Sequence, residues 1–220
     1  MENLRNLKGK ALIKYKQSLT ISPCQKDILI GTLLGDASMR LSQGKPVYAI
    51  KFEQGIQHKE YIEHLYEVFE PYCGTIPKER FIDKEKTRKS IGFTTYRHKN
   101  FIFYYNYFYE IQENKGVKVI RKDIHKFLTP KAVAYWFMDD GTYHIDNYGN
   151  RSYLFSTQGF QKVECQRLCD ALKLNFNIDA NVHKDRKKWR IYVRQLSSQK
   201  LLDLIKPFIH PNFQYKIKVI

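Results

Sequence analysis

The feature that most constrains this chain is an internal repeat. Two apolar, helix-like segments each end in an aspartate, Asp36 and Asp140, which lie 104 residues apart. Each aspartate is followed 18 residues later by the same short element, Gln54-Gly55-Ile56-Gln57 in the first half and Gln158-Gly159-Phe160-Gln161 in the second. Self-similarity at a fixed register indicates duplication. The chain is therefore expected to fold as two related halves.

Hydrophobic periodicity predicts the same order of elements in both halves. In the first half we expect helices over 27–34, 59–69 and 100–109 and strands over 46–53, 75–82 and 90–96. In the second half we expect a helix that starts at Thr129-Pro130 and ends at Asp139-Asp140-Gly141, strands within 143–156 around a turn at 147–150, a helix over 162–174, strands near 178–183 and 189–193, and a helix over 197–205.

Each half is thus predicted as αββαββα, and the fold class as α+β with two pseudo-symmetric subdomains. We place the subdomains at residues 22–109 and 129–218, with a linker at 110–128 whose first part, Glu110 to Lys122, is rich in Lys, Gly and Asn.

Composition points to a polyanionic partner. The 220 residues carry 38 Lys and Arg against 22 Asp and Glu, a formal charge of +16 that is spread along the sequence. Such a folded, basic chain is typical of nucleic-acid binding. The four cysteines contain no CxxC pair, so we expect reduced, mostly buried thiols and no zinc site. The charged first 17 residues do not resemble a signal peptide, and no apolar run is long enough to span a membrane.

The two segments that end in aspartate resemble the nine-residue LAGLIDADG signature of homing endonucleases. The first copy is Leu29 to Ala37 and the second is Val133 to Gly141, with Asp36 and Asp140 at the eighth position of each. The spacing between the copies is similar to that of double-motif members of this family, and the resemblance covers Ser22 to Lys218. It implies a site-specific DNA endonuclease whose two halves present curved antiparallel sheets to double-stranded DNA.

In this family the two aspartates bind divalent metal over the scissile phosphates. The resemblance implies Mg²⁺, for which Mn²⁺ can substitute, and hard carboxylate oxygens suit that ion. The carbonyl before each aspartate commonly adds a ligand, so Gly35 and Asp139 are secondary metal candidates. Asp139 stands beside Asp140, and the register of the two copies favours Asp140.

The second copy departs from the signature where packing matters. Tyr135 stands at the third position, where the first copy has Gly31, and Leu34 and Met138 occupy the sixth position, where the signature has Asp. These changes leave the aspartates intact but question how tightly the two helices pack.

Hydrolysis also needs cationic groups and hydrogen-bond donors near the attacking water. By similarity with the family, Lys118 and Lys216 take the cationic role, and Lys115 or Lys122 could replace Lys118 because the alignment there is loose. The residue that orients water in the first half is Glu53 by strand position or Gln54 by repeat register, with Gln158 opposite.

Outward strand residues are expected to read base edges, and basic hairpin tips are expected to hold phosphates. The candidate DNA contacts are Arg40, Gln43, Tyr48, Lys51, Lys86, Arg88, Tyr143, His144, Arg151, Lys187, Arg190 and Arg194.

We therefore expect a monomer that uses two unequal halves to cut both strands of a long asymmetric site. The alternatives are an RNA maturase that binds its host intron RNA, a non-cleaving binder on the same fold, and a ribosome-associated protein. The expected location is intracellular, in the compartment of the host intron, with an organelle favoured by the richness in Lys, Asn, Tyr and Ile.

Overall fold

The computed structural model describes residues 8–149 and 151–217, which form an α+β chain with two compact units. The first unit contains residues 8–25 and 36–105, and the second contains residues 26–35, 106–149 and 151–217. The expected subdomain end at Lys218 and the turn residue Asn150 lie outside the described residues. No helix within the described ranges is long and apolar enough to cross a membrane.

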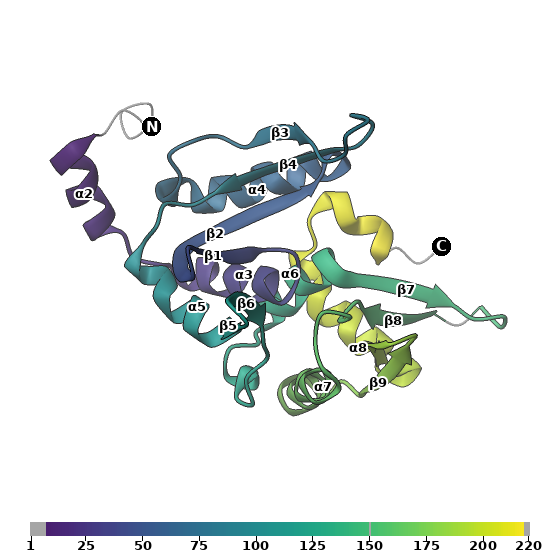
Figure 1. Cartoon of the computed structure of the whole chain (residues 1–220). Helices are drawn as coiled ribbons and strands as arrows, with labels where there is room; N and C mark the ends of the chain where they lie inside the picture. Colours follow the sequence, from purple (N-terminus) through teal and green to yellow (C-terminus); the bar gives the residue numbers. More distant parts are fainter. Residues whose placement is uncertain (1–7, 150, 218–220) are drawn as a thin grey trace. The chain divides into compact units, whose positions relative to one another are not determined.

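The first unit holds a four-stranded antiparallel sheet in the order β1-β2-β4-β3 (Figure 1). Its elements are α2 (Gly9–Ser18), β1 (Ser38–Ser42), β2 (Lys45–Gly55), α4 (Lys59–Phe69), β3 (Lys78–Phe81) and β4 (Lys89–Thr94). The buried side of α4 covers one sheet face, where Phe52 stacks on Phe69 and Phe93 at centroid distances of 5.2 and 4.9 Å. Helix α2 was not predicted from the sequence.

The second unit holds a sheet with the equivalent order, β7-β8-β10-β9. Its elements are most of α3 (Pro23–Leu34), the end of α5 (Ile102–Phe108), β5 (Tyr109–Gln112), β6 (Lys115–Lys118), α6 (Pro130–Asp140), β7 (Gly141–Ile145), β8 (Arg151–Phe155), α7 (Lys162–Phe176), β9 (Ala180–Asp185), β10 (Lys188–Val193) and α8 (Gln195–Ile205). The matching strand order confirms that the sequence repeat is a repeat of topology.

Two expectations about the chain's connections change. The predicted linker is not irregular throughout, because β5 and β6 pair as an antiparallel hairpin. The basic turn expected between the strands near 178–183 and 189–193 is also shorter than predicted, because Lys184, Asp185 and Lys188 belong to the paired strands and only two residues turn. Arg186 makes that turn with a positive φ of 56°.

Local sequence explains where α3 and α6 begin. Ser22 and Gln25 form reciprocal side-chain-to-backbone hydrogen bonds of 3.1 and 2.9 Å, and proline occupies the first helical position. At α6 the hydroxyl of Thr129 accepts a hydrogen bond from the backbone N–H of Ala132 at 3.1 Å. Residues 132–138 are all buried, as expected for a helix that is apolar on every side.

Helices α3 and α6 approach each other backbone to backbone. A Cβ added at Gly31 would collide with the carbonyl oxygen of Ala132 and with Cβ of Tyr135, and one added at Gly35 would meet the side chain of Asp139. Tyr135 is accommodated because the residue that faces it on α3 is Gly31. One glycine at this pair of facing positions is therefore enough for the close approach of the two backbones. The departure from the signature at Tyr135 therefore does not prevent close packing.

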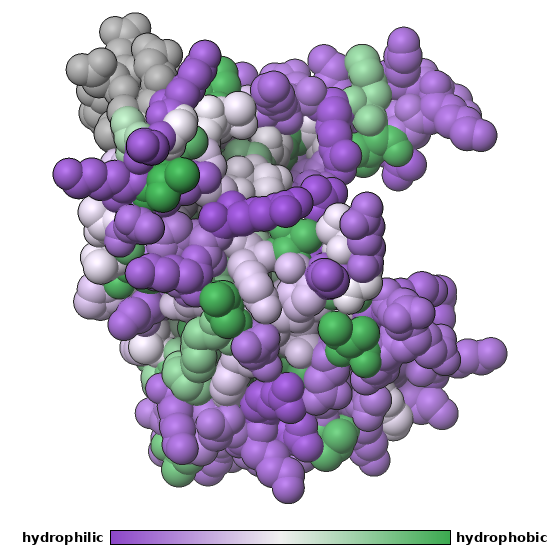
Figure 2. Space-filling model, turned by 60° about the vertical axis from the view of Figure 1, so that its left-hand side comes forward, coloured by the Kyte–Doolittle hydropathy of each residue, from purple (hydrophilic) through white to green (hydrophobic). Residues whose placement is uncertain are grey.

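Many other large apolar side chains lie in the interior, among them Tyr61 and Phe69, whereas Tyr148 and Leu196 are exposed. Figure 2 shows a face on which hydrophilic residues predominate and hydrophobic ones are scattered in small patches. Cys73, Cys165 and Cys169 are buried and Cys24 is exposed, and burial raises the pKa of the Cys73 and Cys169 thiols to about 12. These buried thiols are protonated and unreactive near neutral pH.

Replacing Gly31 by alanine should destabilise the protein by about 1–3 kcal/mol, because the new methyl group must displace backbone atoms of α6. Chemical denaturation measures the change. Gly159→Ala is the matched control, since its Cβ would meet nothing within 4 Å. Equal stability of the two variants would contradict the close approach.

Candidate active site

Asp36 follows the last turn of α3 and carries an exposed carboxylate. The backbone N–H of Gly35 still donates to the carbonyl of Gly31 at 3.1 Å, so the helix geometry extends to the residue before the aspartate. Strand β2 then brings back Gln54, whose Nε2 donates to Oδ2 of Asp36 at 2.7 Å. Of the two residues proposed to orient water in this half, Gln54 is the one that contacts the signature aspartate.

Two lysines reach the carboxyl ends of the signature helices. Nζ of Lys118, at the end of β6, donates to the carbonyl oxygen of Gly35 at 2.8 Å. Nζ of Lys216, in the 3-10 segment Pro211–Lys216, donates to the carbonyl oxygen of Met138 at 2.7 Å. A cation is favoured there because helix carbonyls at that end lack intrahelical partners. Lys115 and Lys122 are exposed.

The two acidic residues at the end of α6 have different surroundings. The side chain of Asp139 lies against the backbone of Gly35, where glycine leaves room for it. Asp140 is the last helical residue, and its carbonyl accepts the backbone N–H of Ser156 at 2.9 Å. That bond joins the helix end to the end of β8. Both carboxylates are half-buried.

Glu53 lies at the centre of an ion-pair cluster in the first unit. Nε and Nη2 of Arg80 donate to its two oxygens at 2.5 and 2.6 Å, the hydroxyl of Ser90 donates at 2.5 Å, and Lys51 forms a further ion pair. Burial alone would raise the pKa of Glu53, but the hydrogen bonds from Lys51, Ser90 and Arg80 outweigh it and hold the pKa at about 2. Glu53 is thus a fixed anion near neutral pH.

A shallow pocket of about 380 Å³ surrounds these groups within the first unit. Its lining residues are Asp36, Ser38, Lys51, Glu53, Gln54, Gly55, Arg80, Ile82 and Ser90. The pocket is open, and most of its lining residues are polar or charged, unlike the enclosed apolar cavities that bind small organic ligands.

In the second unit, Gln158 has a different partner from Gln54. Its Nε2 donates to Oδ2 of Asp185 at 3.1 Å, and Asp185 also forms an ion pair with Nη2 of Arg190 at 2.8 Å. Within residues 8–149 and 151–217, no three His, Cys, Asp or Glu side chains gather into a metal cage.

Strand register separates the proposed DNA contacts into two faces, because residues paired across strands point to the same side. In the first sheet, Lys51 shares with Arg80 the face that points away from α4, and Arg40 is exposed on β1. Gln43 sits in the β1–β2 turn with a φ of 51°. The ring of Tyr48 instead packs edge-on against Tyr105 of α5, at 5.9 Å.

In the second sheet, His144 and Arg190 belong to the rows that point away from α7 and α8. Tyr143 pairs with the buried Tyr153 and therefore lies on the helix side. The remaining basic candidates are exposed residues of the turns and strand ends: Lys86, Arg88, Lys187 and Arg194.

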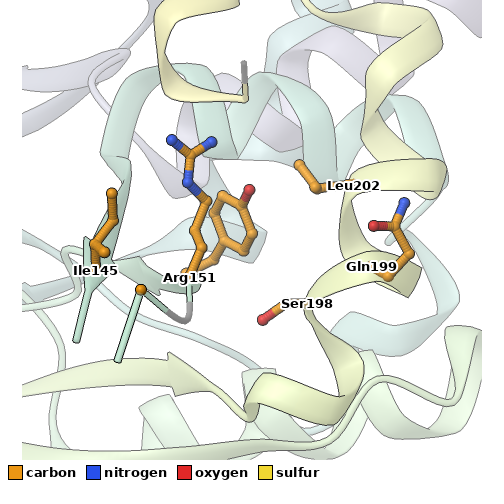
Figure 3. Close-up of a pocket in the computed structure, with 7 residues that line it drawn as sticks. Ile145, Arg151, Ser198, Gln199 and Leu202 are labelled. Atoms are coloured by element: carbon orange, nitrogen blue, oxygen red, sulfur yellow. The ribbon is translucent and has the colours of Figure 1, made fainter. Parts of the chain in front are cut away.

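Arg151 also lies on the helix side of the second sheet. Its guanidinium stacks on Tyr143 at 4.1 Å and lines a pocket of about 190 Å³ between the β7–β8 hairpin and α8 (Figure 3). The hydroxyl of Ser198 points into this pocket from α8 (Figure 3). Tyr48, Tyr143 and Arg151 were expected to face outward, and the register places them on the opposite side of their sheets.

Sequence reasoning missed Arg80 and Asp185, the partners of Glu53 and Gln158. Both lie on the third strand of their sheet as the chain runs, β3 and β9. Arg80 could have been found from the pairing of strands. It pairs with Ser90 on β4, two residues from Gly92, which pairs with Glu53.

The comparisons with known proteins agree with this architecture. Residues 26–201 match the model of the LAGLIDADG DNA endonuclease family. The DNA endonuclease I-ChuI of Chlamydomonas applanata is 30% identical over 90% of this chain and 96% of its own length. The cytochrome b mRNA maturase bI2 of Debaryomyces hansenii is 32% identical over 96% of this chain and 82% of its own.

Among solved structures, the homing endonuclease I-WcaI bound to its DNA recognition sequence superposes with a TM-score of 0.85 and 28% identity, covering 100% of this chain and 98% of that one. The family match spans more than half of the sequence and includes both signature helices, α3 and α6. The chain therefore belongs to the LAGLIDADG DNA endonuclease family.

Proposed function

We propose that this protein is a site-specific homing endonuclease that uses divalent metal to hydrolyse both strands of a long, asymmetric DNA site as a monomer. The observation that carries the proposal is the paired arrangement at the signature helices. An aspartate lies at or just after the carboxyl end of each helix, and at each end a lysine ammonium is bound to a carbonyl within two residues of that aspartate. Carboxylates and ammonium groups placed together suit phosphodiester hydrolysis.

We assign metal binding to Asp36 and Asp140, with the backbone carbonyls of Gly35 and Asp139 as secondary ligands. The donor set consists of hard oxygens, which fits Mg²⁺, or Mn²⁺ in its place. Such a site does not require a protein cage of three acidic side chains, since Mg²⁺ commonly retains water and takes ligands from substrate phosphates. When bound, the metal would lower the pKa of a water molecule and neutralise charge on the phosphate.

The lysines supply fixed positive charge beside these carboxylates. Lys118 already donates to the carbonyl of Gly35, but a carbonyl oxygen has two lone pairs and can also face a cation. We propose that Lys118 and Lys216 stabilise the charge that develops on the phosphate during hydrolysis. Their half-buried positions strengthen that interaction relative to bulk water.

We assign Gln54 and Gln158 to orienting water. Gln54 contacts Asp36, whereas both oxygens of Glu53 are already hydrogen-bonded and its pKa is about 2. A carboxylate with so low a pKa is a weak base at neutral pH. Glu53 instead positions Arg80 and Lys51 on the outward face of the first sheet.

We propose that the outward sheet faces and the hairpin tips bind duplex DNA. The proposed base-reading set is Arg40, Gln43, Lys51, His144, Arg190 and Arg194, to which we add Arg80 because it lies on the same outward face as Lys51. The phosphate-binding set is Lys86, Arg88 and Lys187. Tyr48, Tyr143 and Arg151 are left out because they face the helices.

A second candidate function is RNA maturation, because a relative with 32% identity over most of this chain is named a maturase. In that case host intron RNA is a further partner. A splicing assay with the host intron, run beside plasmid cleavage with Mg²⁺, distinguishes the two activities. In either case the protein would act in the compartment of its intron, which we place in an organelle.

Asp36→Asn and Asp140→Asn should each reduce double-strand cleavage by about 1000-fold or more, since each removes a carboxylate that holds a metal worth several kcal/mol to the transition state. Plasmid linearisation with Mg²⁺ measures the effect. Asp170→Asn, on the exposed side of α7, is the control that keeps full activity. Full activity in either signature variant would refute the assignment.

Glu53→Gln should lower stability in a pH-dependent way. The folded pKa of Glu53, about 2, is below its ordinary value of 4.5, so ionised Glu53 stabilises the native state above pH 4.5 and this contribution disappears as the pH falls towards 2. Urea denaturation of the wild-type protein and the variant from pH 2.5 to 6.5 should give stability curves that converge at low pH. A constant stability difference across this range would contradict the argument.

The cleavage rate of Glu53→Gln should stay within about tenfold of the wild-type rate, because loss of a true general base would cost 10²-fold or more.

The triple variant Lys86→Gln, Arg88→Gln, Lys187→Gln should bind DNA with a weaker salt dependence. The slope of log K against log salt should fall by about 0.9 for each phosphate that the variant no longer neutralises. Fluorescence anisotropy at several salt concentrations measures it. Lys200→Gln, on α8 at the helix side of the second sheet, should leave the slope unchanged. An unchanged slope in the triple variant would remove the tips from the interface.

A further inference from the structure

The two halves hold their repeat-equivalent glutamines in different ways. In the first unit the amide of Gln54 donates to Asp36, the signature aspartate itself, at 2.7 Å. In the second unit the amide of Gln158 donates to Asp185 at 3.1 Å. Asp185 lies at the end of β9 and belongs to no signature. The glutamine recurs at the same position of the sequence repeat, but its hydrogen-bond partner differs between the two units.

Asp185 is itself held in place. Arg190 forms an ion pair with Oδ2 of Asp185 at 2.8 Å, and this is the oxygen that accepts the Gln158 amide. The hydrogen bond from Gln158, followed by the charges of Arg190 and Arg186, lowers the pKa of Asp185, so its carboxylate is ionised at neutral pH. The residue is also fixed by its backbone pairing with Lys188 on β10.

An ionised carboxylate can only accept hydrogen bonds, which settles the orientation of the amide. The nitrogen of Gln158 must face Asp185, so its carbonyl oxygen is directed elsewhere. Two further bonds fix the segment that carries it: the backbone N–H of Ser156 donates to the carbonyl of Asp140 at 2.9 Å, and the hydroxyl of Thr157 donates to the carbonyl of Trp189 at 3.1 Å. The chain next to Gln158 is thereby tied to the end of α6.

We propose that Asp185 is a positioning residue that presets the water-orienting amide of Gln158, so that cleavage of the strand served by the second half depends on a carboxylate that binds no metal. In the first half the amide is instead oriented by the metal-binding aspartate. The anchor of Gln54 is therefore a proposed metal ligand, whereas the anchor of Gln158 has no proposed role in metal binding. This inference rests on the proposed nuclease function.

The experiment measures the cleavage rate of each strand separately, on a duplex that carries a different end label on each strand, with Mg²⁺ in excess. Gln158→Leu identifies the strand served by the second half. Asp185→Leu should slow that same strand by about tenfold, as loss of an outer-shell partner does, and should leave the other strand within about twofold. On a supercoiled plasmid, nicked circles should accumulate.

A double-mutant cycle separates positioning from general damage to the fold. If Asp185 acts through Gln158, the variant with both Asp185→Leu and Gln158→Leu should be no slower than Gln158→Leu alone. Asp185→Glu keeps the charge and should recover part of the rate. Asp179→Leu removes another ion-paired aspartate of the same unit, bound to Lys173 at 2.9 Å, and should not change the ratio of the two strand rates.

The inference would be overturned if Asp185→Leu left the ratio of the two strand-cleavage rates unchanged. Additive effects of Asp185→Leu and Gln158→Leu on the cleavage rate would also overturn it. Failure of the wild-type protein to cut DNA with Mg²⁺ would refute the proposed function instead. Thermal unfolding of every variant shows whether a reduced cleavage rate reflects an unfolded protein. If Asp185→Leu does not fold, the strand-specific rates of Asp185→Glu test the inference instead.

Discussion

The close approach of α3 and α6 is the constraint on which the rest of the site depends. Gly31 and Gly35 lack side chains where α6 presents Ala132, Tyr135 and Asp139, so the two backbones come together without a layer of side chains between them. The carbonyl groups at the two helix ends are what Lys118 and Lys216 bind. Both ammonium groups are therefore positioned by the helix pair, and a shift of either helix would move a lysine and the neighbouring carboxylate together.

The parts of this molecule that follow from local patterns could be predicted from the sequence. Caps at Ser22 and Thr129, apolar helices, and a repeat register at Asp36 and Asp140 are encoded within short windows. Residues whose role depends on strand pairing could not be placed in this way. Tyr143 and Arg151 look like outward polar or aromatic residues in the sequence, but register with Tyr153 turns them towards the helices. A shift of one residue reverses the face of every side chain on a strand.

The choice among neighbouring lysines shows the same limit. The sequence does not distinguish Lys115, Lys118 and Lys122, because all three lie in a segment rich in Lys, Gly and Asn that is predicted as a linker. The β5–β6 hairpin decides between them, because pairing of Tyr109 with Lys118 fixes where β6 ends. Pairing of such short strands depends on the turn between them and on the helices nearby, and sequence windows do not contain that information. The ammonium that reaches Gly35 is thus selected by tertiary structure.

Divergence between the halves is concentrated in the charged groups around repeat-equivalent positions. Glu53 forms ion pairs with Arg80 and Lys51 in the first unit. Thr157, its counterpart in the sequence repeat, donates instead to a strand carbonyl, and in the second unit Asp185 is the acidic residue that pairs with an arginine, Arg190. In both units a carboxylate lies beside an arginine on the outward face of the sheet. The carboxylates, however, come from non-equivalent strands, β2 for Glu53 and β9 for Asp185. In both halves a carboxylate accepts a hydrogen bond from the amide nitrogen, so the two glutamines present the same end of the amide but are held by different elements of the fold. A duplicated chain can therefore keep its proposed metal-binding aspartates in register while the polar residues around them diverge. The two halves then differ in the groups that contact water and base edges, as an asymmetric DNA site requires.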